Sequence, residues 1–245
     1  MDVGSQYVLV VEAAARLDVT PQRVRALLAS GELRGQLAGG VWMIDPASIA
    51  NYSHVRRRAG GRALAPLTAW AALLTSFASD VTAEVASAFG IGGTRLARLR
   101  ALRSRELDDW RWLARRRATV DRYMTRSAYL RRLRDEEDLV PAGSSAATRL
   151  AVPLTPDADV FDAYASRTTA DMLTTRYRLR PDSGGNVTLR SISVDDSDQL
   201  ALILDRPLPD LVVAVDLLED RDPRAAAAGR ELLASRLHLI RSTAR

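Results

Sequence analysis

Residues 11–44 constrain the fold of this chain more than any other stretch, because they carry ordered signals for two helices and a hairpin. Thr20 can cap a helix through its hydroxyl, and Pro21 suits the first helical position, where no amide donor is needed. Val24, Leu27 and Leu28 then follow at the spacing of one apolar helical face. The pattern predicts a helix that begins after Thr20 and buries this face.

A shorter helix is expected just before it, at about residues 11–17. Its Ala13 and Ala14 are small enough to let two helices cross closely, as a helix-turn-helix requires. After the second helix, the pair Gly39-Gly40 separates two short apolar runs, which is a signal for a β-hairpin. Trp42 and Ile44 are expected on one face of its second strand, and Asp45-Pro46 is expected to open a third helix.

The order of these features resembles the excisionase and MerR-like group of winged helix-turn-helix DNA-binding domains. The resemblance implies that the helix starting at Thr20 enters the major groove and that the Gly39-Gly40 hairpin is the wing. The matching residues are Glu12-Ala13-Ala14, Val19-Thr20-Pro21, Val24-Arg25, Ser30-Gly31-Glu32-Leu33 and Gly39-Gly40-Val41-Trp42.

Composition limits the remaining choices. The chain has 245 residues and no cysteine, so disulfides and thiolate metal sites are excluded. No apolar run is long enough to cross a membrane, and the first residues lack the pattern of a signal peptide, so we expect a cytoplasmic protein without membrane contact. No residue pattern predicts a cofactor or a metal site.

Charge is distributed unevenly along the chain. Residues 1–140 contain 22 arginines and 15 acidic residues, whereas residues 141–245 contain 13 arginines and 15 acidic residues. Nucleic acid is the natural partner of a basic part, and a mildly acidic part suggests a different one.

Turn-forming segments predict two boundaries, at Gly60-Gly61 and at residues 141–145. We therefore expect a winged helix-turn-helix in residues 1–59, a basic helical block with one strand at 118–125 in residues 60–140, and a small α+β domain in residues 141–245. The predicted class is α+β and mainly helical. In the last domain we expect a strand at 150–152, helices at 160–165, 170–175, 210–219 and 222–239, and a hairpin of 177–180 with 187–192.

The whole layout also resembles the AbiEi-type antitoxins, which are encoded beside nucleotidyltransferase toxins. The resemblance implies an antitoxin that represses its own operon through the amino-terminal part and neutralises the toxin largely through the carboxy-terminal part. The segments that carry it, after the winged helix, are Gly61–Leu74, Arg115–Leu133, Asp138–Gly143, Asn186–Arg190 and Ala214–Leu233.

Candidate DNA-binding residues follow from the predicted helix and wing. Residues in the first turn of a recognition helix usually reach base edges, so Gln22 and Arg23 are expected to read bases, adenine and guanine respectively. Arg25 and Arg34 are expected on phosphate. The full set is Thr20, Gln22, Arg23, Arg25, Arg34, Gly39, Gly40, Arg56, Arg57 and Arg58.

Two acidic groups are candidates for contact with a toxin, because an acidic surface suits a partner that handles RNA or nucleotides. Ordinary solvated turns explain the same residues, since loops favour aspartate. The residues are Asp195, Asp196, Asp198, Glu219, Asp220 and Asp222.

The wing itself is apolar where phosphate contacts would need charge. Leu37, Val41 and Met43 are therefore expected to pack on a neighbour, either a second copy on adjacent half-sites or the following helical block.

Two alternatives stay open. One is a free-standing excisionase-like or MerR-like regulator with a sensing or self-associating carboxy-terminal domain. The other is a nucleotidyltransferase, because Gly143-Ser144 followed by Asp157 and Asp159 matches its glycine-serine and paired-carboxylate spacing. Pro153 and Pro156 interrupt the strand that such an enzyme needs, so we expect no enzyme.

Overall fold

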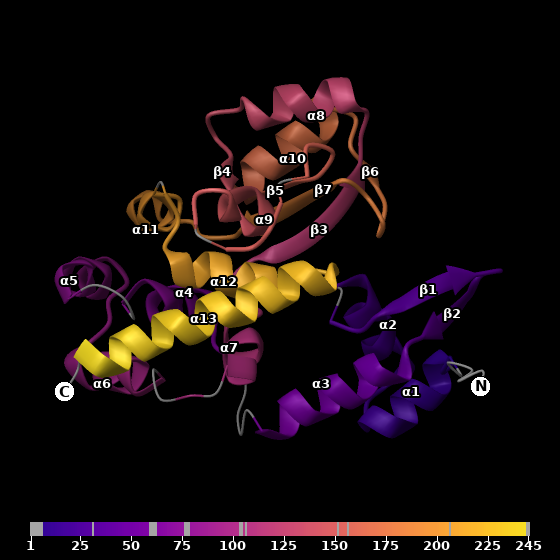
Figure 1. Cartoon of the computed structure of the whole chain (residues 1–245), viewed down its shortest axis with the longest axis horizontal. Helices are drawn as coiled ribbons and strands as arrows, with labels where there is room; N and C mark the ends of the chain where they lie inside the picture. Colours follow the sequence, from indigo (N-terminus) through magenta and orange to yellow (C-terminus); the bar gives the residue numbers. More distant parts are fainter. Residues whose placement is uncertain are drawn as a thin grey trace. The chain divides into compact units, whose positions relative to one another are not determined.

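The computed structural model describes residues 7–30, 32–58, 63–75, 79–102, 105, 107–150, 152–155, 157–205 and 207–243. The chain has mixed α and β structure in which helix predominates, and it divides into two units, residues 1–62 and 63–245 (Figure 1). The division lies close to the boundary expected after Ala59, and the Gly60-Gly61 pair itself lies outside the described residues.

Unit 1 has two short helices, a hairpin and a longer helix. The elements are α1 (Val10–Leu17), α2 (Pro21–Ala29), β1 (Gly35–Ala38), β2 (Val41–Ile44) and α3 (Pro46–Arg58). The expected alanine contact is confirmed, since Ala13, Ala14 and Leu17 of α1 are buried. As predicted, α3 begins at Pro46 after a cap, because the backbone N–H of Ala47 donates to Asp45 Oδ1 at 2.8 Å. Gly31, part of the matching segment Ser30-Gly31-Glu32-Leu33, lies outside the described residues.

Unit 2 is built around a five-stranded sheet. Its strands are β3 (Thr119–Met124), β4 (Val140–Pro141), β5 (Phe161–Ser166), β6 (Arg180–Pro181) and β7 (Val187–Ile192). Their order across the sheet is β4-β5-β7-β3-β6, with β5 and β7 parallel and the other pairs antiparallel. Its helices are α4 (Pro66–Thr75), α5 (Ser79–Ala88), α6 (Gly93–Ala101), α7 (Leu107–Ala114), α8 (Ser127–Arg134), α9 (Gly143–Ala147), α10 (Arg167–Arg176), α11 (Ser197–Ile203), α12 (Asp210–Leu218) and α13 (Pro223–Thr243).

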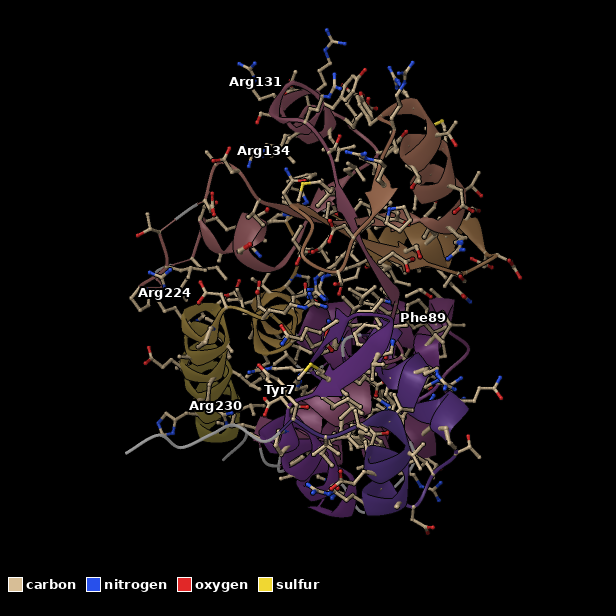
Figure 2. The ribbon with its side chains drawn as sticks, turned by 90° about the vertical axis from the view of Figure 1, so that its right-hand side faces the viewer. Tyr7, Phe89, Arg131, Arg134, Arg224 and Arg230 are labelled. Carbon is tan, nitrogen blue, oxygen red and sulfur yellow. The ribbon has the colours of Figure 1, made fainter. Side chains whose placement is uncertain are left out.

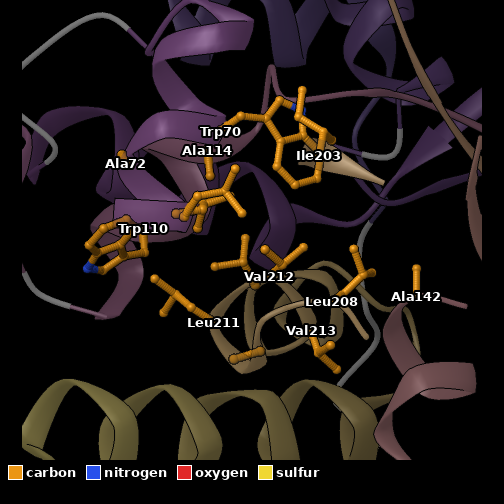
Figure 3. Close-up of a cluster of buried hydrophobic side chains, with 14 of the residues drawn as sticks. Trp70, Ala72, Trp110, Ala114, Ala142, Ile203, Leu208, Leu211, Val212 and Val213 are labelled. Carbon is orange, nitrogen blue, oxygen red and sulfur yellow. The ribbon is translucent and has the colours of Figure 1, made fainter. Parts of the chain in front are cut away.

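The sheet separates two hydrophobic layers. On one face, α8 and α10 cover Phe161, Ala163 and Leu189 (Figure 1). Beyond the other face lies the larger layer, where Trp70 of α4 and Trp110 of α7 meet the apolar side chains of α12 (Figure 3).

This arrangement corrects the expected boundary at residues 141–145. β3, from the expected middle block, pairs with β7 along residues 119–123, and β4 at Val140–Pro141 pairs with β5. The segment predicted as a domain boundary therefore contains the end of β4 and the start of α9, and Ala142, Gly143 and Ala146 are buried there. Residues 63–140 and 141–245 share one sheet and one core, so they are not separate domains.

Three local predictions in this part were wrong. Residues 161–166 form strand β5 and not a helix. The segments 177–180 and 187–192 do not form a hairpin with each other, because β3 lies between β6 and β7. Leu150 and Val152 belong to no strand. The strand β3 and the helices α10, α12 and α13 lie where the sequence predicts them.

Candidate nucleic-acid interface

Helix α2 has one buried side and one exposed side. The backbone N–H of Arg23 donates to Thr20 Oγ1 at 3.2 Å, which is the predicted cap, and Pro21 occupies the first turn. Val24, Leu27 and Leu28 are buried. The opposite side presents three polar side chains to solvent, those of Gln22, Arg23 and Arg25.

The Gly39-Gly40 turn has the geometry that a tight hairpin requires. Both glycines have positive φ, 56° and 80°, a combination that L residues with side chains rarely adopt. The register pairs Ala38 with Val41 and Leu37 with Trp42. A compact two-residue turn therefore projects from unit 1.

The apolar side chains of the hairpin are only partly covered. Leu37 and Val41 are 60% and 51% exposed, whereas Met43 and Trp42 are half-buried and Ile44 is fully buried. The isolated bridge between Val8 and Ile44 places Leu9, which is also exposed, beside Met43 on the outer face. The outer face of the hairpin carries Gln36, Ala38, Val41 and Met43, all of them uncharged, and Leu37 lies on the other face with Trp42.

The basic candidates of unit 1 fall into two groups. The side chains of Arg23, Arg25 and Arg34 are exposed and have no hydrogen bond or ion pair to any part of the chain that the structure describes. The backbone of Arg34 makes hydrogen bonds: its N–H donates to Ser48 Oγ, and its carbonyl oxygen accepts from the N–H of Asp45. The backbone of α3 extends to Arg58, but the side chains of Arg56, Arg57 and Arg58 lie outside the described residues.

Asp18 ends α1 in the left-handed conformation, with φ 52° and ψ 53°. Its backbone N–H bonds the carbonyls of Ala14 and Ala15, so the chain turns sharply into α2. Aspartate tolerates this conformation better than most residues. The turn thereby fixes the approach of the two helices.

The acidic candidates of unit 2 do not form one surface. Asp195, Asp196 and Asp198 lie before and at the start of α11, where Asp196 caps the helix by accepting from the N–H groups of Asp198 and Gln199. The other group, Glu219, Asp220 and Asp222, follows the C-terminal end of α12, a helix of nine residues that is about 13 Å long. Asp220 and Asp222 there accept backbone N–H bonds from Asp222 and Arg224.

The side chain of Glu219 is bound by arginines inside the protein, so Glu219 is not available for contact with a toxin. Its carboxylate accepts from Arg117 at 2.6 and 2.8 Å and from Arg190 at 3.0 Å. These bonds belong to a buried ionic network between the sheet and α12, which consists of Arg117, Asp162, Tyr164, Arg190, Asp216 and Glu219.

Within the network, Arg190 binds Asp162 through two parallel bonds of 2.8 and 2.9 Å, the strongest geometry for this pair. Asp216 accepts from Arg117 at 2.5 Å and from the Tyr164 hydroxyl at 2.7 Å. Two positively charged guanidinium groups thus face three carboxylates, and the network links α12 to strands β5 and β7.

The sequence carries signals for this network that we missed. Asp216 is the single acid in the middle of the apolar helix α12, and Asp162 and Arg190 are the single charged residues of strands β5 and β7. A lone charge in a buried element indicates a buried partner. Which partner it takes depends on the sheet order.

Burial and neighbouring charge shift the pKa values within the network in opposite directions. Burial alone would lower the pKa of Arg117, but Glu219, Tyr164 and Asp216 raise it well above its ordinary value. Burial raises the pKa of Asp216 in spite of the two arginines. Burial acts in the same sense on Glu219, but the charge and hydrogen bonds of Arg117 outweigh it and lower the pKa of Glu219.

The residues of the nucleotidyltransferase pattern are not brought together on a strand. Asp157 and Asp159 lie exposed in the turn before β5, where the backbone N–H of Asp159 donates to Asp157 Oδ1 at 2.8 Å. Gly143 starts α9 with φ 44°, and a Cβ at that position would meet the carboxylate of Asp162. The carboxylates beside Gly143 are therefore those of Asp162 and Asp216, which the arginines of the ionic network already bind.

Several arginines of the basic middle block serve the fold of unit 2. Arg117 lies in the ionic network, Arg115 stacks over the ring of Trp112 at 3.6 Å, and Arg134 donates to the backbone carbonyls of Ala158 and Val160. Others stay exposed, as Figure 2 shows for Arg131 on the outer side of α8. Only the exposed group is available to a partner.

No family model, curated protein or solved structure matches the chain. Among the helices that the structure describes, none combines the length and apolar character needed to cross a membrane.

Proposed function

We propose that this protein is a sequence-specific DNA-binding protein whose unit 1 acts as a winged helix-turn-helix. The observation that carries the proposal is helix α2, which is capped by Thr20, buries Val24, Leu27 and Leu28, and exposes Gln22 and Arg23 in its first turn. First-turn residues of a recognition helix are those that reach base edges. The hairpin of β1 and β2 is the wing.

More particularly, we propose a transcriptional autorepressor that is also the antitoxin of a nucleotidyltransferase toxin, acting in the cytoplasm. This step rests on the resemblance of the chain to AbiEi-type antitoxins. In this proposal unit 2 contacts the toxin, and the exposed Asp195 and Asp198 supply negative charge to the contact. It assigns no catalytic role and no cofactor.

The test of DNA reading compares two arginine variants on a duplex from the region upstream of the gene and on a scrambled duplex. Arg23→Ala should cost about 1–3 kcal/mol of binding free energy on the upstream duplex and relax preference at one base pair. Arg25→Gln should instead weaken binding to both duplexes alike and make the salt dependence shallower. Equal losses for both variants on both duplexes would refute the assignment of Arg23.

The test of toxin neutralisation uses the full chain and a nucleotidyltransferase encoded next to it. Asp195→Arg with Asp198→Arg should reduce rescue of growth on co-expression, because charge reversal opposes a basic partner. Arg23→Ala should leave rescue unchanged while it weakens repression. If the charge reversals rescue as well as the wild type, the acidic group is not the contact.

A further inference from the structure

Helix α6 in unit 2 carries three exposed arginines, Arg95, Arg98 and Arg100, and begins a basic segment of the sequence. Residues 93–105 contain five arginines and no acidic residue, and one of the five, Arg105, forms an ion pair with Asp109 at 3.9 Å. The comparable segment around α8, residues 126–138, contains four arginines and four acidic residues, so its charges cancel. Electrostatic attraction of an anion therefore favours α6 over α8.

The exposed arginines of α6 flank a face of small side chains. Thr94, Ala97 and Ala101 are exposed and share one side of the helix, opposite the buried Leu99. Because successive helical residues rotate by about 100°, Arg98 and Arg100 lie on the two flanks of that face. The small side chains allow a partner to approach the helix backbone closely, and one arginine lies on each side of this face.

The two flanking arginines are not used by the fold. The side chains of Arg98 and Arg100 are exposed and have no hydrogen bond or ion pair to the residues that the structure describes, whereas the side chain of Arg95 donates to Thr68 Oγ1 of α4 at 2.5 Å. Helix α4, which packs against α6, contains no charged residue. Nothing described on these two helices neutralises the flanking charges.

We infer that α6 is a second nucleic-acid surface, which lies in a groove of duplex DNA so that Arg98 and Arg100 reach phosphates of the two strands. The major groove is about 12 Å wide and admits a helix. A protein partner fits less well, because the face lacks the large aromatic or aliphatic side chains that anchor protein interfaces. This inference rests on the proposed function in taking duplex DNA as the partner.

The experiment measures binding of the full chain to the upstream duplex and to the scrambled duplex over a range of salt concentrations. The variant Arg98→Gln with Arg100→Gln should bind both duplexes more weakly. Its slope of log affinity against log salt should become shallower by about 1.8, since each phosphate contact contributes about 0.9. The matched control, Arg131→Gln with Arg132→Gln on α8, removes the same charge and should keep the wild-type slope.

The outcomes separate this inference from the proposed function. If the wild type prefers the upstream duplex and Arg23→Ala loses that preference, but the α6 and α8 variants have equal slopes, the role of α6 is refuted alone. If the wild type binds no duplex, the proposed function fails. If the α6 variant loses affinity for single-stranded RNA and not for duplex DNA, the α6 surface belongs to a different nucleic acid and the inference is overturned. Circular dichroism melting curves equal to that of the wild type establish that both double variants are folded.

Discussion

At the scale of single residues, burial divides the arginines of unit 2 into two groups. Arg117 and Arg190 are almost completely buried and bind three carboxylates between the sheet and α12. Arg98 and Arg100 are exposed on α6. Removal of one partner of a buried ion pair leaves a charge without compensation, whereas an exposed charge is solvated by water. The first group therefore determines stability.

Asp162→Asn should destabilise the protein by about 3–5 kcal/mol, because the buried guanidinium of Arg190 loses its two-bond partner. The measurement is the free energy of unfolding in urea. Asp159→Asn changes an exposed aspartate a few residues away and should have no resolvable effect. Equal values for the two variants would contradict the structural role of the network.

Glu219 makes stability depend on pH in a defined direction. Its pKa is lower in the folded protein than in the unfolded chain, so its stabilising contribution is present above the ordinary glutamate pKa and is lost as pH falls through the lowered value. The raised pKa of Asp216 acts in the opposite sense, because protonation of Asp216 favours the folded state.

Glu219→Gln should cost on the order of 3 kcal/mol of unfolding free energy at pH 7, the lower end of the range for breaking a buried ion pair. The difference from the wild type should shrink as pH falls below 4.5, the ordinary pKa of glutamate. Denaturant unfolding at pH 7 and at acidic pH measures it, with the exposed Glu231→Gln as the control. A difference that stays constant with pH would refute the assignment.

At the scale of elements, the cap of α2 connects stability to the proposed DNA contact. Thr20→Ala removes the acceptor of the Arg23 N–H and should destabilise unit 1 by about 1 kcal/mol. Without the cap, the first turn of α2 should fray. Because this turn contains Gln22 and Arg23, affinity for the upstream duplex should fall too. Thr20→Ser keeps the acceptor and should retain both properties. Loss in the serine variant as well would mean that the methyl group, and not the cap, matters.

The β1–β2 hairpin offers a test of self-association on DNA, which stays a prediction. Val41 is 51% exposed, so Val41→Glu should change monomer stability by less than about 0.5 kcal/mol. If a second copy covers the outer face of the hairpin, the variant should bind the upstream duplex with reduced cooperativity. Titrations followed by gel shift measure this. A Hill slope that equals the wild-type value would show that the face is simply exposed.

At the scale of the whole molecule, the sheet of unit 2 decides where the chain can be divided. Residues 63–245 should unfold cooperatively as a fragment, because they contain all five strands of the sheet and both layers of its core. Residues 141–245 should not fold alone, because they lack β3, which pairs with β7, and Trp70 and Trp110 of the larger layer. Thermal melting followed by circular dichroism distinguishes the two fragments. A cooperative transition in the shorter fragment would refute this reasoning.

The features that the sequence predicted correctly depend on near neighbours in the chain. The cap and apolar stripe of α2, the Asp45-Pro46 start of α3 and the two positive φ angles of the Gly39-Gly40 turn each follow from a few adjacent residues. Caps, helical spacing and turn conformation are local properties, so the exposed residues of the candidate interface in unit 1 were predictable.

The features that only the tertiary structure decided depend on distant partners. The sequence predicted a helix at β5 although Phe161, Ala163 and Ala165 alternate there with polar residues. The segment is a strand because it pairs with β4 and β7, and its polar side is buried against partners elsewhere in the chain. β3 pairs with strands that lie far away in the chain. This pairing, which the sequence of β3 does not determine, is what joins residues 63–245 into one unit. Arg117 lies in an arginine run that resembles a solvated surface, yet it is buried because the fold brings Asp216 and Glu219, about a hundred residues later, against it.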